Sequence, residues 1–174
     1  MACELTTGVA LGCRDNAGGV KEFYIANVPA TGLGITQDGT GVVTAIAAGA
    51  TYFKYVPRKK TGMWQDEVTV NDANGTVYYA QTAQIPLTKM EQAKRNEVML
   101  LAKANLSIIV KDQNDKYWLL GQDNGITLAT SQGTSGTDYG DRNGYVLNFE
   151  GGEPEAAPTV DYAAFSGLIS ATTI

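Results

Sequence analysis

Histidine is absent from this chain of 174 residues, and cysteine occurs only twice, at Cys3 and Cys13. Histidine is the commonest general base and a common ligand of metal ions. Its absence excludes every catalytic triad or dyad built on histidine, and two cysteines are too few for a zinc site or a disulfide framework. The composition therefore favours a protein that is not an enzyme and that binds no metal or cofactor.

Long hydrophobic runs are missing as well, since the longest is Val98–Ala102. A helix that crosses a bilayer needs roughly 20 apolar residues. The first residues also lack the basic and apolar regions of a signal peptide. We therefore expect no membrane anchor and no export signal, and the scarcity of cysteine indicates a reducing compartment.

Motifs for nucleotides and calcium are incomplete. Gly32-Leu33-Gly34 begins a dinucleotide-binding pattern, but Gln37 stands where the third glycine is needed. The segment 112–116 resembles the start of a calcium loop, but Tyr117 takes the place of its glycine. We interpret both segments as ordinary loops or turns.

Charge is scarce and unevenly distributed. Charged residues make up 18% of the chain, and its net charge is −5. Residues 1–116 hold 12 basic and 11 acidic residues, whereas residues 117–174 hold one basic residue, Arg142, against seven acidic ones. An acidic chain gains little from neutralising phosphates, so we expect no tight binding of nucleic acid. A chain polarised in this way is suited to docking head to tail on a copy of itself.

Short alternating or β-branched runs separated by glycine, proline and asparagine dominate the sequence, which predicts about eight strands. They cover residues 20–28, 42–47, 50–56, 64–71, 76–85, 106–110, 116–120 and 145–149. Asn74-Gly75 predicts a type I′ hairpin, and Pro86 is expected to end the strand that follows it. Long loops are expected over 29–41 and 130–144. The fold class predicted is mainly β: an antiparallel sandwich or barrel with one flanking helix and extended terminal arms.

The flanking helix is predicted over about 88–104, where strong helix formers follow a capping box of Thr88 and Glu91. Three parts of the chain are expected: an arm over 1–19, a β domain over 20–152 and an arm over 153–174. The segment Val56–Met63 is expected to form a hairpin with a basic tip. We expect that tip to dock on acidic groups of a neighbouring subunit, so the candidate interface residues are Arg58, Lys59, Lys60, Asp138, Asp141, Glu153 and Glu155.

The order of these pieces resembles the major tail or tail-tube protein family of bacteriophages. The run Asp141–Pro154, with its Tyr-x-Leu-x-Phe strand and Gly-Glu-Pro turn, carries most of the resemblance. The opening, Met-Ala-Cys-Glu-Leu-Thr-Thr-Gly, is similar to that of small virion proteins of phages infecting Bacteroidetes-type hosts. The resemblance covers half to two-thirds of the chain, and the family has no catalytic residues to transfer.

The resemblance implies a virion structural protein that is assembled in the bacterial cytoplasm. Six copies join their inner sheets into a ring, and rings stack head to tail into a tube through which DNA passes without specific binding. Other phage tail proteins are the implied partners. The segments expected to contact neighbouring rings are Val56–Met63, residues 29–41 and the arms. A head–tail connector or collar ring remains an alternative, as does a β-sandwich module for carbohydrate binding or adhesion.

Overall fold

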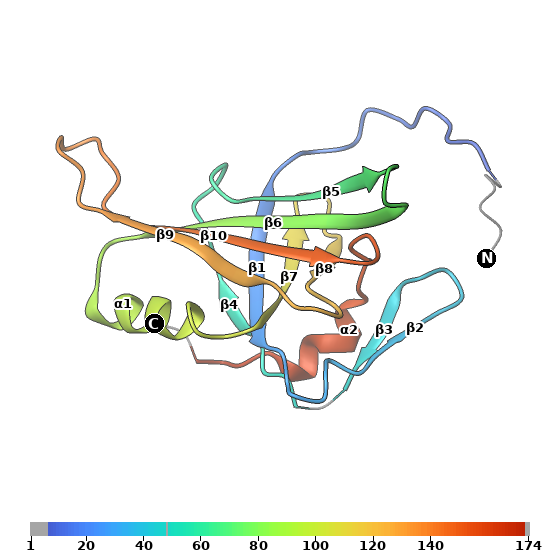
Figure 1. Cartoon of the computed structure of the whole chain (residues 1–174). Helices are drawn as coiled ribbons and strands as arrows, with labels where there is room; N and C mark the ends of the chain where they lie inside the picture. The colour runs from blue at the N-terminus through green and yellow to red at the C-terminus, as the bar shows by residue number, and fades with distance from the viewer. Residues whose placement is uncertain (1–6, 48, 173–174) are drawn as a thin grey trace.

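The computed structural model describes residues 7–47 and 49–172. Within these residues, ten strands, two α-helices and one 3-10 helix form two four-stranded antiparallel sheets, a two-stranded sheet and their connections (Figure 1). The predicted fold class is confirmed, because the protein is mainly β with antiparallel sheets and a flanking helix.

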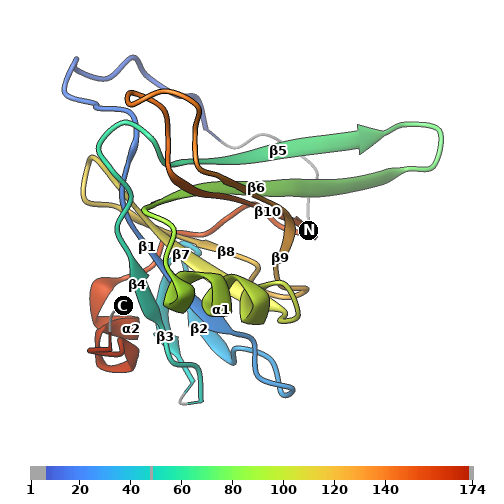
Figure 2. The ribbon, with the colours of Figure 1, turned by 90° about the vertical axis from the view of Figure 1, so that its left-hand side faces the viewer.

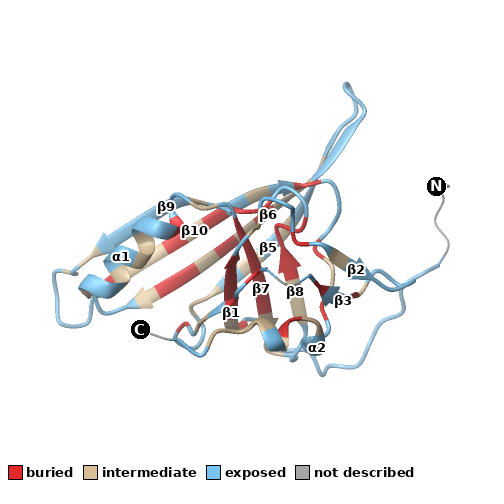
Figure 3. Ribbon diagram, turned by 90° about the horizontal axis from the view of Figure 1, so that it is seen from below, coloured by how far each residue is buried: buried red, intermediate tan, exposed pale blue. Residues whose placement is uncertain are grey.

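The first four-stranded sheet, called sheet 1 below, is covered on both faces. Its strands lie in the order β4 (Phe53–Tyr55), β1 (Val20–Asn27), β7 (Leu106–Asp112) and β8 (Tyr117–Leu120). Most of β7 and the middle of β1 are buried, as the red strands in Figure 3 show. Continuous apolar runs of this kind are typical of strands buried from both sides.

The second four-stranded sheet, called sheet 2 below, is covered on one face. Its strands lie in the order β5 (Met63–Asn71), β6 (Thr76–Thr88), β10 (Gly144–Glu153) and β9 (Thr127–Thr134). Along β6, buried and half-buried residues alternate from Gln81 to Ile85, so this part of the strand turns one face toward the core. The other half of β6 continues with β5 into a hairpin that projects beyond the body of the molecule (Figure 2).

Two hydrophobic cores lie on the two faces of sheet 1. The first core lies between the sheets and includes Phe23, Ile85, Ile108, Leu147 and Phe149. The second lies behind sheet 1, under β2 (Ile35–Gln37), β3 (Val43–Ile46), α2 (Tyr162–Phe165) and η1 (Ser166–Leu168). The expected loop over 29–41 therefore contains a short strand, β2, which pairs with β3.

The C-terminal segment was expected to be an extended arm, and over its described residues this expectation is wrong. The side chains of Val160 and Phe165 are buried in the second core, because they cover apolar residues on the outer face of sheet 1. The domain therefore continues past residue 152. At the other end, the described residues 7–19 of the predicted N-terminal arm are exposed.

Helix α1 (Gln92–Leu101) confirms the predicted helix but not its predicted cap. Thr88 is the last residue of β6 and pairs with Gly144, so its backbone belongs to the sheet. The Glu91 carboxylate binds the ammonium groups of Lys89 and Lys94 and makes no side-chain cap hydrogen bond. Pairing in sheet 2 thus shortens the helix at its N-terminal end.

The segment Val56–Met63 is not a hairpin, because the strands on either side of it belong to different sheets. Strand β4 pairs with β1 in sheet 1, whereas β5 pairs with β6 in sheet 2. The basic residues 58–60 therefore lie on a crossover between the sheets. Sequence alone could not distinguish these cases, since both place a polar turn between two β-rich runs.

Two local predictions in sheet 2 also require correction. The hairpin at Asn74-Gly75 exists, but its loop has four residues and only Gly75 has a positive φ, so it is not a type I′ turn. Pro86 does not end β6, which continues to Thr88 and pairs with β10. Strand β5 begins opposite Gln84, so no strand lies beside Pro86 on that side of β6. The missing N–H of the proline therefore leaves no hydrogen bond unmade there. Strand β9 likewise extends into the loop expected over 130–144.

Candidate assembly surfaces

The C-terminal segment bonds the outer edge of β8 and the residue that precedes β4, Tyr52, in sheet 1. Beside β8, the Leu119 N–H donates to the Pro158 carbonyl at 3.0 Å and the Val160 N–H donates to the Tyr117 carbonyl at 2.9 Å. Next to β4, the Tyr52 N–H donates to the Leu168 carbonyl at 2.9 Å, and the Tyr52 carbonyl accepts from Ser170 at 2.8 Å. These bonds occupy backbone groups that would otherwise be open to another strand.

Both margins of sheet 2 are open. Among the described residues, β5 pairs only with β6, and β9 pairs only with β10. Natural monomers protect such edges with lysine, proline, inward-pointing charges or bulges. Strand β9 has no charged residue and no proline, and its one register irregularity faces β10 rather than the open side. It is therefore a strand edge with little protection against pairing.

The strand directions in sheet 2 allow identical copies to continue the sheet. Each strand of sheet 2 is antiparallel to its neighbour, so the first and the fourth strands, β5 and β9, run in opposite directions. When copies are placed side by side in the same orientation, β5 of one copy meets β9 of the next as an antiparallel pair. This is a heterologous contact of the kind that closes into a ring when the rotation between copies permits.

The outer face of sheet 2 is polar and lacks basic residues. Sheet 1 and both helices lie on its other side (Figure 1). The Gln84 amide donates to Asn148 at 3.0 Å, and the Asn148 amide donates to the Thr130 hydroxyl at 2.9 Å, which links three strands across this face. None of β5, β6, β9 and β10 contains a lysine or an arginine. This surface offers no cation to a phosphate backbone.

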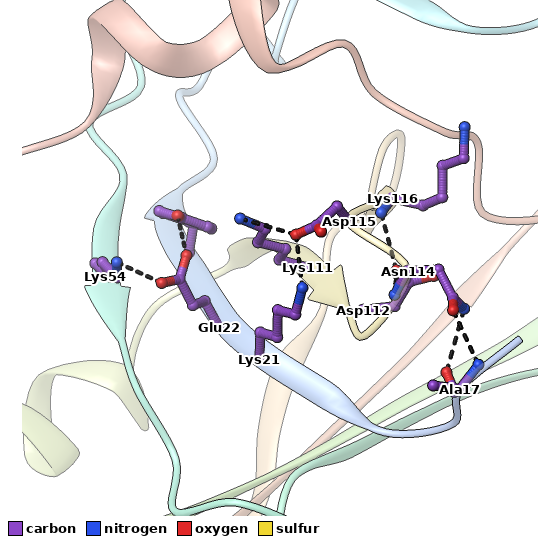
Figure 4. Close-up of polar contacts among 10 residues, drawn as sticks. Ala17, Lys21, Glu22, Lys54, Lys111, Asp112, Asn114, Asp115 and Lys116 are labelled. Carbon is purple, nitrogen blue, oxygen red and sulfur yellow. Dashed lines mark hydrogen bonds and ion pairs between the residues drawn. The ribbon is translucent and has the colours of Figure 1, made fainter.

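The strands of sheet 1, by contrast, carry several lysines held in ion pairs (Figure 4). Lys21 and Lys111 both bind Asp115, at 2.7 and 3.3 Å, and Lys54 binds Glu22 at 2.6 Å. Hydrogen bonds from Lys21 and Lys111 lower the pKa of the Asp115 carboxyl. Partial burial opposes a similar effect at Glu22, but the contacts with Lys54 and Tyr24 leave the pKa of its carboxyl lowered. These charges are used within the subunit.

The predicted interface residues fall at two opposite ends of sheet 2. Arg58, Lys59 and Lys60 precede the start of β5, are exposed and form no ion pair within the described part of the chain. Because β10 runs in the same direction as β5, Asp138 and Asp141 before it lie at this same end. Glu155 follows β10 and lies at the opposite end. When copies are stacked end to end, the basic residues of one copy face the opposite end of the next. Among the predicted acids that are exposed, Glu155 lies at that end.

Glu153 was predicted to be an interface residue, and this prediction is wrong because its side chain is buried. Its side chain is 1% exposed, and its carboxylate accepts hydrogen bonds from the backbone N–H groups of Asp123, Asn124 and Gly125 at 3.0 to 3.2 Å. Burial raises the pKa of the Glu153 carboxyl, and the three N–H donors oppose that shift. Glu153 ties the end of β10 to the turn after β8 and so joins the two sheets.

Asp141 also has a local structural role. Its Oδ2 accepts hydrogen bonds from the N–H groups of Thr137 and Asp138 at 2.8 and 2.9 Å, which close the loop between β9 and β10. These bonds lower the pKa of the Asp141 carboxyl. The loop projects at the end of sheet 2 opposite to the β5–β6 turn (Figure 1).

The sequence interpretation missed the apolar surface of the projecting hairpin. Val70 and Val77 pair across the hairpin and are 58% and 52% exposed, and Val68 is exposed on the same face. Alternation alone does not show where the opposite sheet ends, so it does not separate exposed Val77 from buried Ile85 on the same strand. The sequence did contain one usable signal, which is the lack of any basic residue between Lys60 and Lys89.

The chain matches no known protein-family model and no curated protein sequence. Within the described residues, no group of three or more acidic, histidine or cysteine side chains is placed to hold a metal ion. Helices long and apolar enough to cross a membrane are likewise not found among the described residues.

Proposed function

We propose that this chain is a bacteriophage virion structural protein whose copies form a ring, and that the rings stack into a tail tube. The observation that carries the proposal is the contrast between the sheets. The C-terminal segment bonds the backbone of β8 and of Tyr52, the residue before β4, in sheet 1. Among the described residues, no further strand pairs with β5 or β9, the outer strands of sheet 2, which run in opposite directions. In the proposed ring, β5 of each subunit pairs with β9 of its neighbour. The copies of sheet 2 then form one continuous wall around the channel.

The chemistry of the proposed channel wall supports this role. DNA that passes through a tube must not be held by the wall, and a surface without lysine or arginine has no group that attracts phosphate strongly. The uncovered face of sheet 2 meets this requirement over all four strands. The basic residues 58–60 lie on the crossover at one end, where we assign them to contacts between rings.

The test is the assembly state of the purified protein over a wide range of concentrations. Sedimentation velocity is expected to detect a closed ring, and negative-stain microscopy is expected to show rings that stack into tubes at high concentration. A connector or collar component, the alternative within virions, forms rings that do not stack on themselves. A protein that remains monomeric at the highest concentration contradicts both forms of the proposal.

A further inference from the structure

The two tryptophans of the chain, Trp64 and Trp118, meet at the mouth between the two sheets. Trp64 lies on β5 opposite Ala83, and Trp118 lies on β8 opposite Val110. Their ring centroids are 5.3 Å apart and their planes are inclined by 34°. Both side chains are only half-buried, so they leave aromatic surface open at this mouth.

The residues around this pair are held in place by hydrogen bonds. Asp112 fixes the Trp118 indole, whose Nε1–H donates to its Oδ2 at 3.2 Å. The other oxygen of Asp112 accepts from the N–H groups of Asn114 and Lys116 at 2.8 and 2.9 Å (Figure 4). The aromatic surface and its surroundings are therefore organised before any ligand arrives, which reduces the cost of binding.

The N-terminal arm forms one wall of the site. The Ala17 N–H donates to Asn114 Oδ1 at 2.9 Å, and the Asn114 amide donates to the Ala17 carbonyl at 3.2 Å (Figure 4). The same amide donates to Asn16 at 2.6 Å. The Gln113 N–H donates to the Gly19 carbonyl at 3.1 Å. An open cleft of about 840 Å³ results between this wall and the tryptophans.

We propose that this cleft binds a neutral saccharide. The apolar C–H face of a pyranose ring can stack on an indole ring, and its hydroxyl groups require side chains that both donate and accept hydrogen bonds. The side chains of Asp15, Gln113 and Lys116 line the cleft and make no side-chain hydrogen bond within the described residues. Asp115 is paired with Lys21 and Lys111, but Asp15 and Asp112 also line the cleft against one lysine, Lys116, so its charge disfavours an anionic ligand. The inference does not depend on ring formation.

The two tryptophans are the only ones in the chain, so intrinsic tryptophan fluorescence reports on this cleft alone. The full-length protein is titrated with maltose, cellobiose, lactose and diacetylchitobiose, and binding is measured in parallel by isothermal calorimetry. We expect saturable binding of at least one of these disaccharides. If none of the four binds by either measurement at millimolar concentrations, the proposal is overturned.

Variants then locate the binding site. We expect Trp118→Ala to weaken binding by about tenfold, and Gln113→Ala to weaken it less. Trp118→Phe keeps an aromatic ring at the mouth of the cleft and is expected to retain part of the affinity, so it covers the case in which the alanine variant does not fold. The matched control is Tyr139→Ala, which removes an exposed aromatic residue outside the cleft. Affinity that is unchanged in a folded Trp118 or Gln113 variant, or lost in the control, contradicts this location.

Discussion

The two four-stranded sheets of this protein have the same antiparallel pairing but opposite relations to their surroundings. Sheet 1 lies between two cores, and the C-terminal segment bonds β8 at one margin and Tyr52, just before β4, at the other. Sheet 2 contributes one face to a core, and within residues 7–47 and 49–172 no strand pairs with either of its margins. A single chain thus contains one sheet that is covered on both faces and one that we propose is continued by another copy.

The burial pattern of the side chains differs between the two sheets. In β7 the residues from Leu106 to Val110 are all buried, whereas in β10 burial alternates from Leu147 to Glu150. Alternation is typical of an antiparallel sheet with one solvated face, and a continuous apolar run requires cover on both faces. Sheet 1 therefore depends on its covering segments for stability, and sheet 2 does not depend on any cover for its outer face.

The largest expected effect comes from removing the cover of sheet 1. Phe165 is fully buried and contacts the rings of Tyr24, Tyr52 and Tyr117 edge-on. We expect Phe165→Ala to lower the free energy of unfolding by about 3–5 kcal/mol, because it leaves a cavity in the second core. Urea denaturation followed by circular dichroism measures this change. The matched substitution on sheet 2, Val146→Ala, is expected to cost less than about 1 kcal/mol, and equal costs would contradict the comparison.

The second effect concerns Glu153, which joins the sheets. We expect Glu153→Gln to lower the free energy of unfolding by about 1–3 kcal/mol, because the amide cannot accept all three buried N–H groups. The folded-state pKa of this carboxyl is raised above 4.5, so its contribution to stability is complete below that pH and declines as the pH rises through the folded-state pKa. Denaturation curves across this pH range are expected to lack that decline in the variant, and a parallel decline in both proteins would show that other groups cause it.

The third effect tests the open margin of sheet 2. Ser131 lies on β9 opposite Leu147 and is exposed. Ser131→Lys places a charge on the inner side of an edge strand, a device that natural proteins use against edge pairing. We expect the variant to fold and to need about tenfold more protein for ring assembly, as measured by sedimentation. Ser135→Lys, in the exposed loop after β9, is the matched control and is expected to assemble normally. Normal rings in the Ser131 variant would exclude pairing through β9.

The smallest expected effect concerns contacts between rings. Replacing Arg58, Lys59 and Lys60 with glutamate places negative charge opposite Glu155 and Asp72 of a stacked copy, since both acids lie at the other end of sheet 2. We expect rings to persist while tubes become several-fold shorter, because exposed charges contribute modestly and are screened by salt. Tube lengths in negative-stain images at low and high salt measure this. The control exchanges lysine and arginine at the same positions, and tubes of unchanged length in the glutamate variant would remove these residues from the interface.

Much of the fold could be predicted from the sequence. The strand around Ile108, the hairpin at Asn74-Gly75 and the helix after Glu91 all follow from local patterns, and the structure confirms each as an element. The predictions that were wrong depended on distant partners. Thr88 does not cap a helix because it pairs with Gly144, and residues 56–63 do not form a hairpin because β4 and β5 pair in different sheets.

The candidate site was less accessible to prediction than the fold. Residues 58–60 were found because a basic cluster is visible in any sequence, and the structure leaves them exposed. Glu153 was taken for an exposed acid, since the turn that it binds is 28 residues away. The meeting of Trp64 with Trp118, 54 positions apart, could not be foreseen, because it requires the packing of the two sheets.

The sequence by itself determined the β character of the protein, the positions of most strands and the absence of basic residues from four of them. These properties depend on side-chain alternation, turn residues and composition, which act over a few neighbouring positions. Only the tertiary structure decided which strands share a sheet, which margins remain open and where the C-terminal segment lies. Those features arise from contacts between residues far apart in the chain, where burial of apolar surface outweighs the local preferences of each segment.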